Sequence, residues 1–215
     1  MRFFLFTDLH QNLEQLDKLV AAYKESDSEF VVCLGDVTNF GTSEQACEIL
    51  GKFNAKVYSI PGNCDPLDFP DKIGKVAVNM HCRSEEVDGY DLVGIGGSNI
   101  TIFNTAFELQ EDELYDGLKG NSKNGMILMT HVPSYGILDE IPSGLNVGSP
   151  AVKRIVDEYH PILAMSGHIH EAIGTKEIDG TVFVNPGPAK DGYYAIIDVE
   201  NGNVNVELRK ITDNL

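Results

Sequence analysis

Short apolar runs alternate with amphipathic stretches along the first 60 residues of the chain. The runs cover residues 2–7, 30–34 and 56–60. Continuous apolar runs of this length are typical of strands that are buried on both faces. Each run is followed at once by a short polar turn, so the pattern predicts three buried strands with polar groups at their carboxyl ends.

Two amphipathic helices are predicted between these strands. Asn12 with Gln15, and Thr42 with Gln45, have the spacing of a helix capping box. The apolar stripes that follow are Leu13, Leu16, Leu19, Val20 and Tyr23 in the first helix and Ile49, Leu50 and Phe53 in the second. The order strand, helix, strand, helix, strand predicts a parallel sheet that is covered by helices.

The rest of the chain is predicted to contain further strands, two helices and two loops. Asp88-Gly89 is a hairpin turn signal between residues 76–87 and 91–96. Beyond it we expect a loop at 98–109, a short acidic helix at 111–118, strands at 126–129 and 162–165, a long loop at 132–149 and a helix at 150–159. Strands dominate the last third, which predicts a second sheet packed on the first. No linker or repeat divides residues 1–215, so a single domain is expected.

The charge of the chain argues against long nucleic acids as partners. The formal net charge is −17, and only 16 Lys and Arg are scattered over 215 residues. Binding an extended phosphate backbone requires a basic track, because neutralisation of phosphates supplies much of the affinity. A small phosphorylated substrate that is held by metal ions stays compatible with this charge.

The composition predicts a cytoplasmic protein. No apolar run approaches the roughly 20 residues that a bilayer-spanning helix needs, so no membrane association is expected. The apolar N-terminus is too short for a signal peptide, since Asp8 and His10 follow at once. The four cysteines form no C-x-x-C pair, which favours a reducing compartment over a disulfide framework.

Potential metal ligands follow five of the predicted strands. They lie in Asp8-Leu9-His10, Gly35-Asp36, Gly62-Asn63-Cys64-Asp65, Thr130-His131 and Gly167-His168-Ile169-His170. In open α/β sheets, chemistry takes place outside the carboxyl ends of the strands. Carboxylate and amide oxygens together with imidazole nitrogens suit Mn, Fe, Zn, Co or Ni better than calcium or a copper site.

In this order, the five blocks resemble the calcineurin-like metallophosphoesterases, and the sequence around His131 and His168 resembles more narrowly the Icc-related phosphoesterases. The resemblance covers nearly the whole chain. It implies an α/β fold in the form of a four-layer α/β/β/α sandwich, in which two mixed sheets are flanked by helices. It also implies two divalent transition-metal ions, manganese first among them, and a phosphoester substrate that is attacked by a metal-bridging hydroxide.

The resemblance also implies a role for each residue of the site. One metal is expected at Asp8, His10 and His170, and the other at Asn63, His131 and His168. Asp36 is expected to bridge the two ions. The expected catalytic residues are Asp36, Asn63, Cys64 and Asp65, with Asp65 orienting its loop.

Cys64 departs from many members of the family, which carry histidine at this position. A thiol beside two dications is expected to become a thiolate, which cannot donate a proton to a leaving group. Loss of a general acid typically costs about 10²–10⁴ in rate. The sequence therefore favours phosphodiesters or phenolic leaving groups, while a mere space-filling role for Cys64 is the alternative.

Two other functions are considered. One is a small-molecule phosphomonoesterase, and the other is a non-catalytic metal-binding or protein-interaction module, as is known for the retromer subunit with this fold. The seven competent ligand positions favour an enzyme. Specificity is expected to lie in residues 98–109 and 132–149, Tyr135 is a candidate substrate contact, and a monomer or homodimer is expected.

Overall fold

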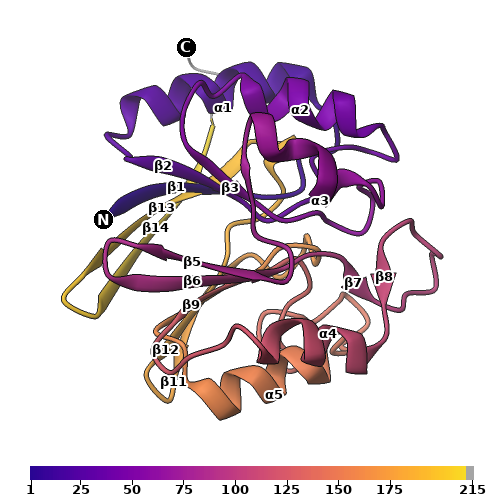
Figure 1. Ribbon diagram of the computed structural model, residues 1–215, viewed down its shortest axis with the longest axis vertical. Coiled ribbons are helices and arrows are strands. Elements are labelled where there is room, and N and C mark those ends of the chain that lie inside the picture. Colours follow the sequence, from indigo (N-terminus) through magenta and orange to yellow (C-terminus); the bar gives the residue numbers. More distant parts are fainter. Residues whose placement is uncertain (212–215) are drawn as a thin grey trace.

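Two six-stranded sheets face each other in the computed structural model, and helices cover the outer face of each sheet (Figure 1). The structure describes residues 1–211. The four-layer sandwich with two mixed sheets, predicted from the sequence, is confirmed. None of the helices within the described residues has the length and apolarity that a bilayer crossing requires.

The first sheet has the order β14-β13-β1-β2-β3-β4. Its strands are β1 (Arg2–Phe6), β2 (Phe30–Cys33), β3 (Val57–Ser59), β4 (Val78–Asn79), β13 (Tyr193–Glu200) and β14 (Asn203–Lys210). Strands β1 to β4 run parallel, and β13 pairs with β1 in the antiparallel direction. The carboxyl ends of β1, β2 and β3 therefore meet at one edge of the sheet.

The second sheet has the order β11-β12-β10-β9-β6-β5. Its strands are β5 (Arg83–Val87), β6 (Tyr90–Ile95), β9 (Ile127–Thr130), β10 (Leu163–Met165), β11 (Gly174–Ile178) and β12 (Thr181–Asn185). The four central strands are parallel, and the two outer strands are antiparallel hairpin partners. The Asp88-Gly89 turn between β5 and β6 confirms the predicted hairpin, but its first strand begins at Arg83, whereas residues 78–79 form β4 in the first sheet.

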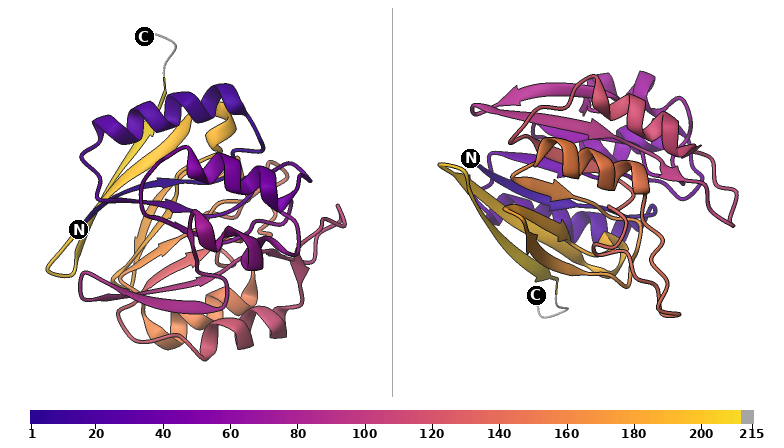
Figure 2. Two further views of the ribbon diagram at one scale, coloured as in Figure 1. Left: turned by 45° about the horizontal axis from the view of Figure 1, so that its top comes forward. Right: turned by 90° about the horizontal axis from the view of Figure 1, so that it is seen from below.

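Helices pack in separate groups on the two sheets. α1 (Leu13–Glu25), α2 (Ser43–Gly51), α3 (Phe69–Lys72) and the 3₁₀ turn η1 (Ile73–Lys75) belong to the half with the first sheet. α4 (Glu111–Lys119) and α5 (Pro150–Tyr159) lie side by side over the second sheet (Figure 2). A further turn, η2 (Ala189–Asp191), precedes β13.

The alternation of side chains along β1 builds two of the three apolar layers. Phe3 and Leu5 point into the layer between the sheets, while Phe4 and Phe6 point into the layer beneath α1 and α2. Residues i and i+2 share a face of a strand, so one continuous apolar run fills both layers. A third apolar layer lies between the second sheet and helices α4 and α5.

The assignment of the C-terminal strands to a second sheet was only partly right. The hairpin β11-β12 does join the second sheet, but β13 and β14 return to the first sheet. Phe3 lies opposite Ile197 in this pairing. Asn201-Gly202 forms the turn between β13 and β14, but a local turn sequence contains no information on which sheet edge the hairpin will extend.

Two details of α1 differ from the sequence prediction, whereas the capping box of α2 agrees with it. Leu13 was placed on the apolar stripe of α1, but its side chain is 61% exposed because it lies on the first helical turn, outside the packed face. Thr42 and Gln45 form the complete capping box of α2. At α1, Asn12 caps the helix with its side chain, whereas Gln15 Oε1 has no hydrogen-bond partner within residues 1–211.

Residues 98–109, predicted as a loop, contain two very short strands. β7 (Ser98–Asn99) pairs in parallel with β8 (Glu108–Leu109) and closes the segment at its base. Such two-residue strands carry too short a pattern for recognition in the sequence.

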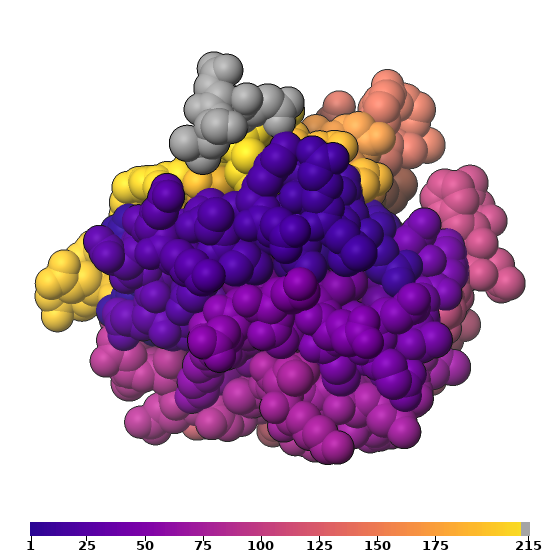
Figure 3. Space-filling view, turned by 90° about the horizontal axis from the view of Figure 1, so that it is seen from above, coloured from indigo at the N-terminus to yellow at the C-terminus, as the bar shows by residue number. Residues whose placement is uncertain are grey.

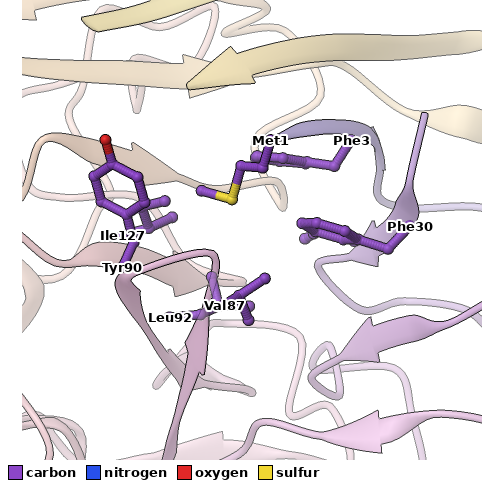
Figure 4. A pocket seen from close by; sticks show the side chains of 8 residues that line it. Met1, Phe3, Phe30, Val87, Tyr90, Leu92 and Ile127 are labelled. Carbon is purple, nitrogen blue, oxygen red and sulfur yellow. The ribbon is translucent and has the colours of Figure 1, made fainter. Parts of the chain in front are cut away.

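A small cavity of about 10 Å³ lies between the sheets, away from the polar turns (Figure 4). It is lined by apolar side chains, among them Phe3, Phe30 and Ile127. An enclosed apolar space of this size leaves no room for a substrate. The candidate site must therefore be sought at the strand ends.

Candidate metal centre

The structure brings all seven predicted metal-ligand residues together at one edge of the sandwich. Asp8 and His10 follow β1, Asp36 follows β2, and Asn63 follows β3 in the first sheet, while His131 follows β9 and His168 and His170 follow β10 in the second. The cluster thus spans the seam between the two sheets. Each sheet contributes residues from the carboxyl ends of its parallel strands, where the sequence placed them.

Two carboxylates form the buried centre of this cluster. Asp8 is 1% exposed and Asp36 is 2% exposed. The Asp8 carboxylate accepts hydrogen bonds from the Thr7 hydroxyl at 2.7 Å and the His168 backbone N–H at 3.1 Å, and the Asp36 carboxylate accepts one from the Cys64 N–H at 2.7 Å. These bonds hold each carboxylate in one orientation but leave its second oxygen facing the histidines.

Imidazole nitrogens surround these two carboxylates. Three groups have their donor atoms within 4.8 Å of one another, namely Asp8 with His10 and His170, His10 with Asp36 and Cys64, and Asp8 with Asp36 and His131. His170 Nε2 lies 3.1 Å from Asp8 Oδ1, and His10 Nε2 lies 3.6 Å from Asp36 Oδ2. The His168 ring is centred 5.1 Å from the ring of His131.

The His131 ring is oriented by a backbone carbonyl. Its Nδ1 lies 2.8 Å from the Leu34 carbonyl oxygen, which only accepts, so Nδ1 carries a proton. Its Nε2 faces Asn63 Oδ1 at 2.9 Å and Asp36 Oδ2 at 3.6 Å. In the neutral ring Nε2 therefore carries the lone pair, in the position that metal coordination requires.

Four residues of the cluster have left-handed backbone conformations. The φ angles are +55° for Asp8, +47° for His10, +49° for Asp36 and +65° for His168. Such conformations cost free energy for residues other than glycine and persist only where the surroundings impose them. Backbone bonds from Asp8 N to Gly35 O and from His10 N to Asp36 O, at 3.0 and 2.9 Å, couple these turns to one another.

The electrostatics of the cluster reflect its buried negative charge. Burial opposes a charge on His131, but the carboxylates of Asp36 and Asp8 outweigh it and raise the pKa of His131 to about 9. Burial, reinforced by the charge on His131, lowers the pKa of His168 to about 4. Burial would raise the pKa of Asp8, yet the His170 hydrogen bond and the neighbouring imidazoles hold that pKa well below its usual range.

A metal centre accounts for an otherwise unpaired group. His10 Nε2 is buried and has no hydrogen-bond partner within residues 1–211, although it lies 3.7 Å from Asp8 Oδ1 and 3.6 Å from Asp36 Oδ2. The ion-pair partners found for the two carboxylates in this part of the chain are all histidines. Buried carboxylates and imidazoles that converge in this way fit divalent transition metals.

Cys64 lies at the edge of the centre. Its Sγ accepts a weak hydrogen bond from Asn63 Nδ2 at 3.6 Å and belongs to one of the ligand groups above. Burial and then the charge of Asp36 raise the pKa of the Cys64 thiol, so the metal-free protein holds it protonated. The thiolate expected from the sequence concerns Cys64 beside two metal ions and stays a prediction.

Asp65 holds the two neighbouring loops together. Its fully buried carboxylate accepts hydrogen bonds from the backbone N–H groups of Val37, Thr38 and Gly62 at 2.8 to 3.3 Å and from the Thr38 hydroxyl at 2.8 Å. These contacts join the turn with Asp36 to the turn with Asn63. These hydrogen bonds are compatible with the loop-orienting role expected for Asp65, which stays a prediction.

Four other residues do not belong to the seven predicted metal ligands. His81 packs on Phe107 with ring centroids 5.2 Å apart, and the exposed His160 ends α5 in a left-handed conformation. Tyr135 is 48% exposed. Asn185 Nδ2 donates a hydrogen bond to the Ile169 carbonyl oxygen at 2.8 Å and thereby supports the turn with His168 and His170.

The sequence missed one contact to a ligand residue. Thr105, in the segment 98–109, accepts a hydrogen bond from Asn63 Nδ2 at 3.0 Å. No motif contains Thr105, and its spacing from Asn63 carries no signal. Figure 3 shows residues near position 100 projecting from the body of the molecule. Two apolar side chains of the segment, Ile102 and Phe103, are 94% and 76% exposed.

The fold and the cluster of ligands define a metallophosphoesterase. Residues 1–172 match the calcineurin-like phosphoesterase family, and the chain belongs to that family. It is 32% identical over 207 residues to an uncharacterized protein of Methanocaldococcus jannaschii, and the match covers 92% of each chain.

Two solved structures share the fold at low sequence identity. A dimetal phosphatase from Danio rerio has a TM-score of 0.65 at 12% identity, with 98% of this chain and 96% of that chain covered. An archaeal phosphodiesterase has a TM-score of 0.59 at 14% identity, with 97% and 100% covered. These likenesses support the family fold.

Proposed function

We propose that the protein hydrolyses phosphodiesters in preference to phosphomonoesters and that it uses two divalent metal ions for this reaction. The observation that carries the metal dependence in this proposal is the buried, unpaired His10 Nε2 between the carboxylates of Asp8 and Asp36. Family membership supports hydrolysis of a phosphoester. A small phosphorylated molecule is the proposed substrate, in keeping with the net charge of −17.

The proposed ligands divide into two sets around one shared carboxylate. Asp8, His10 and His170 would hold one ion, which agrees with the first of the three ligand groups. Asn63, His131 and His168 would hold the other, and Asp36 would contribute to both. The mixture of oxygen and nitrogen donors suits manganese and also Fe, Zn, Ni or Co.

The protein's own residues would orient the reaction. When bound, a pair of divalent ions supplies Lewis acidity, which lowers the pKa of a water for attack at phosphorus and offsets phosphoryl charge. The Cys64 N–H holds the Asp36 carboxylate, and the Leu34 carbonyl fixes the tautomer of His131. Asp65 keeps the turns with Asp36 and Asn63 in register, since it binds the backbone of both.

The preference for diesters rests on Cys64. Neither a thiolate, the state expected beside two dications, nor a thiol carries positive charge, whereas an imidazolium at the same position donates a hydrogen bond strongly. A monoester has more negative charge to balance and benefits more from a cationic donor. The archaeal phosphodiesterase with the same fold is consistent with diester hydrolysis.

The experiment compares bis-p-nitrophenyl phosphate with p-nitrophenyl phosphate in the presence of Mn, Ni, Co, Zn or Mg. Metal content is measured after purification without added metal. The His131→Ala variant removes a proposed ligand, and His160→Asn removes an exposed imidazole at a left-handed position that asparagine tolerates.

We expect faster diester hydrolysis, lost by more than about 100-fold in His131→Ala and retained in His160→Asn. Faster monoester hydrolysis would support the phosphomonoesterase instead. Two bound ions without turnover of either ester would support a binding module.

A further inference from the structure

The metal-ligand candidate Asn63 is held from outside the centre by the segment 98–109. Asn63 Nδ2 donates a hydrogen bond to the Thr105 hydroxyl oxygen at 3.0 Å. The Asn63 backbone carbonyl accepts a second bond, from the Phe107 N–H, also at 3.0 Å. Both the side chain and the main chain of Asn63 are thus fastened to the same segment, 42 and 44 residues further along the chain.

The carboxylate of Glu108 determines whether the Thr105 hydroxyl donates to Asn63 or accepts from it. Glu108 Oε1 accepts from the Thr105 hydroxyl at 2.6 Å, the Thr105 N–H at 2.9 Å and the Thr101 hydroxyl at 2.6 Å. Burial acts in the opposite sense, but these bonds lower the pKa of Glu108 to about 2, so the group is ionised and only accepts. The single hydroxyl proton of Thr105 therefore points to Glu108, and its oxygen is left to accept from Asn63.

This chain of donors and acceptors fixes the side-chain amide of Asn63. Because Thr105 offers only an acceptor to Asn63, the NH₂ group of Asn63 must face it. The carbonyl oxygen Oδ1 is then turned the other way, toward His131 Nε2 at 2.9 Å. A rotated amide would present NH₂, which has no lone pair for a metal, to the centre.

We propose that Thr105, backed by Glu108, is a positioning residue that turns the amide oxygen of Asn63 toward the metal centre. The inference rests on the proposed role of Asn63 as a metal ligand. It also gives the segment 98–109 a part in metal binding. Partners that orient metal ligands typically contribute 10–100-fold to metal affinity or activity, and we expect Thr105 to contribute about as much to one of the two ions.

Three variants separate this role from a general effect on the segment. Thr105→Val keeps the shape of the side chain but removes the acceptor. Thr105→Ser keeps the hydroxyl and is the rescue variant. Thr101→Val is the matched control, since it removes another donor to Glu108 from the same segment and leaves the bond between Thr105 and Asn63 in place.

The metal-free proteins are titrated with Mn²⁺ alone, and binding is followed by calorimetry and by electron paramagnetic resonance. In Thr105→Val we expect one of two binding events to weaken 10–100-fold and the other to change less than about threefold. At intermediate Mn²⁺ the six-line signal of an isolated ion should then replace the signal of a coupled pair. Thr105→Ser and Thr101→Val should bind as the wild type does, and circular dichroism checks that all variants are folded.

Two results would overturn the inference while leaving the proposed function intact. One result is that Thr105→Val binds both Mn²⁺ ions as tightly as the wild type does, while the wild-type enzyme hydrolyses the ester. The other is that Mn²⁺ binding weakens equally in Thr105→Val and Thr101→Val. If the wild-type protein itself binds no Mn²⁺, the proposed function fails and the inference fails with it.

Discussion

Replacement of Gly62 by alanine tests whether the close contact between two turns builds the metal centre. Gly62 lies directly before Asn63, and its Cα faces Asp36. A Cβ atom added at Gly62 would lie 2.0 Å from Asp36 Oδ1 and 2.2 Å from Asp36 N, whereas real Cβ contacts essentially never fall under 3.0 Å. The two turns must therefore separate by about 1 Å, and the obstacle includes backbone that cannot rotate away.

The expected cost follows from two local terms. Overpacking of a well-packed site typically costs about 1–3 kcal/mol. The displacement would also break the bond of 2.7 Å from the Cys64 N–H to Asp36 Oδ1, and a hydrogen bond to a charged group contributes about 1.5–3 kcal/mol. Together they predict a loss of about 2.5–6 kcal/mol in the free energy of unfolding. A displacement of this size should weaken ester hydrolysis by about 100-fold.

Urea unfolding, Mn²⁺ titration and ester hydrolysis of Gly62→Ala measure these effects, with Gly120→Ala as the control. Gly120 ends α4 with helical backbone angles, and an added Cβ there meets no atom within 4 Å. This control should be neutral or more stable by about 0.4–1 kcal/mol, because alanine restricts the unfolded chain. Equal stability and equal Mn²⁺ affinity in the two variants would refute the claim that the contact at Gly62 builds the centre.

Three further predictions concern pH, metal removal and specificity. Burial lowers the pKa of His81 to about 4, and its Nδ1 accepts the Gly96 N–H at 3.1 Å, so protonation breaks this bond. The unfolded chain takes up the proton first, near pH 6.5. Stability is therefore full above that pH and falls toward pH 4, by about 2 kcal/mol at pH 5, and urea unfolding at pH 8 and pH 5 should show this dependence reduced in His81→Asn. A chelator should lower the melting temperature by about 5–10 °C, since ions at 100 times their dissociation constant stabilise by about 2.7 kcal/mol; an unchanged melting curve would argue against a bound metal. Cys64→His should raise monoester relative to diester hydrolysis by about 10-fold or more, and an unchanged ratio of kcat/KM would contradict the role of Cys64.

The order of the elements was predictable because it depends on local patterns. The apolar run of β1 and the capping box at Thr42 specify a buried strand and a helix start from neighbouring residues alone. The polar turns that follow the strands were recognisable for the same reason. Leu13 shows the limit of this approach, because an apolar residue at the first turn of a helix matches the pattern even where nothing packs against it.

The tertiary structure decided which side chains meet and which of their atoms face one another. The bond between His170 and Asp8 joins residues 162 positions apart, and it exists because β1 and β10, in different sheets, end at the same edge of the sandwich. Ring tautomers and amide orientations depend on single acceptors such as the Leu34 carbonyl and the Thr105 hydroxyl. The sequence by itself therefore determined the residue types at the strand ends, and its resemblance to a known family predicted the fold class. The packing of two sheets decided the geometry, because hydrogen bonds between distant segments form only after the sheets are in place.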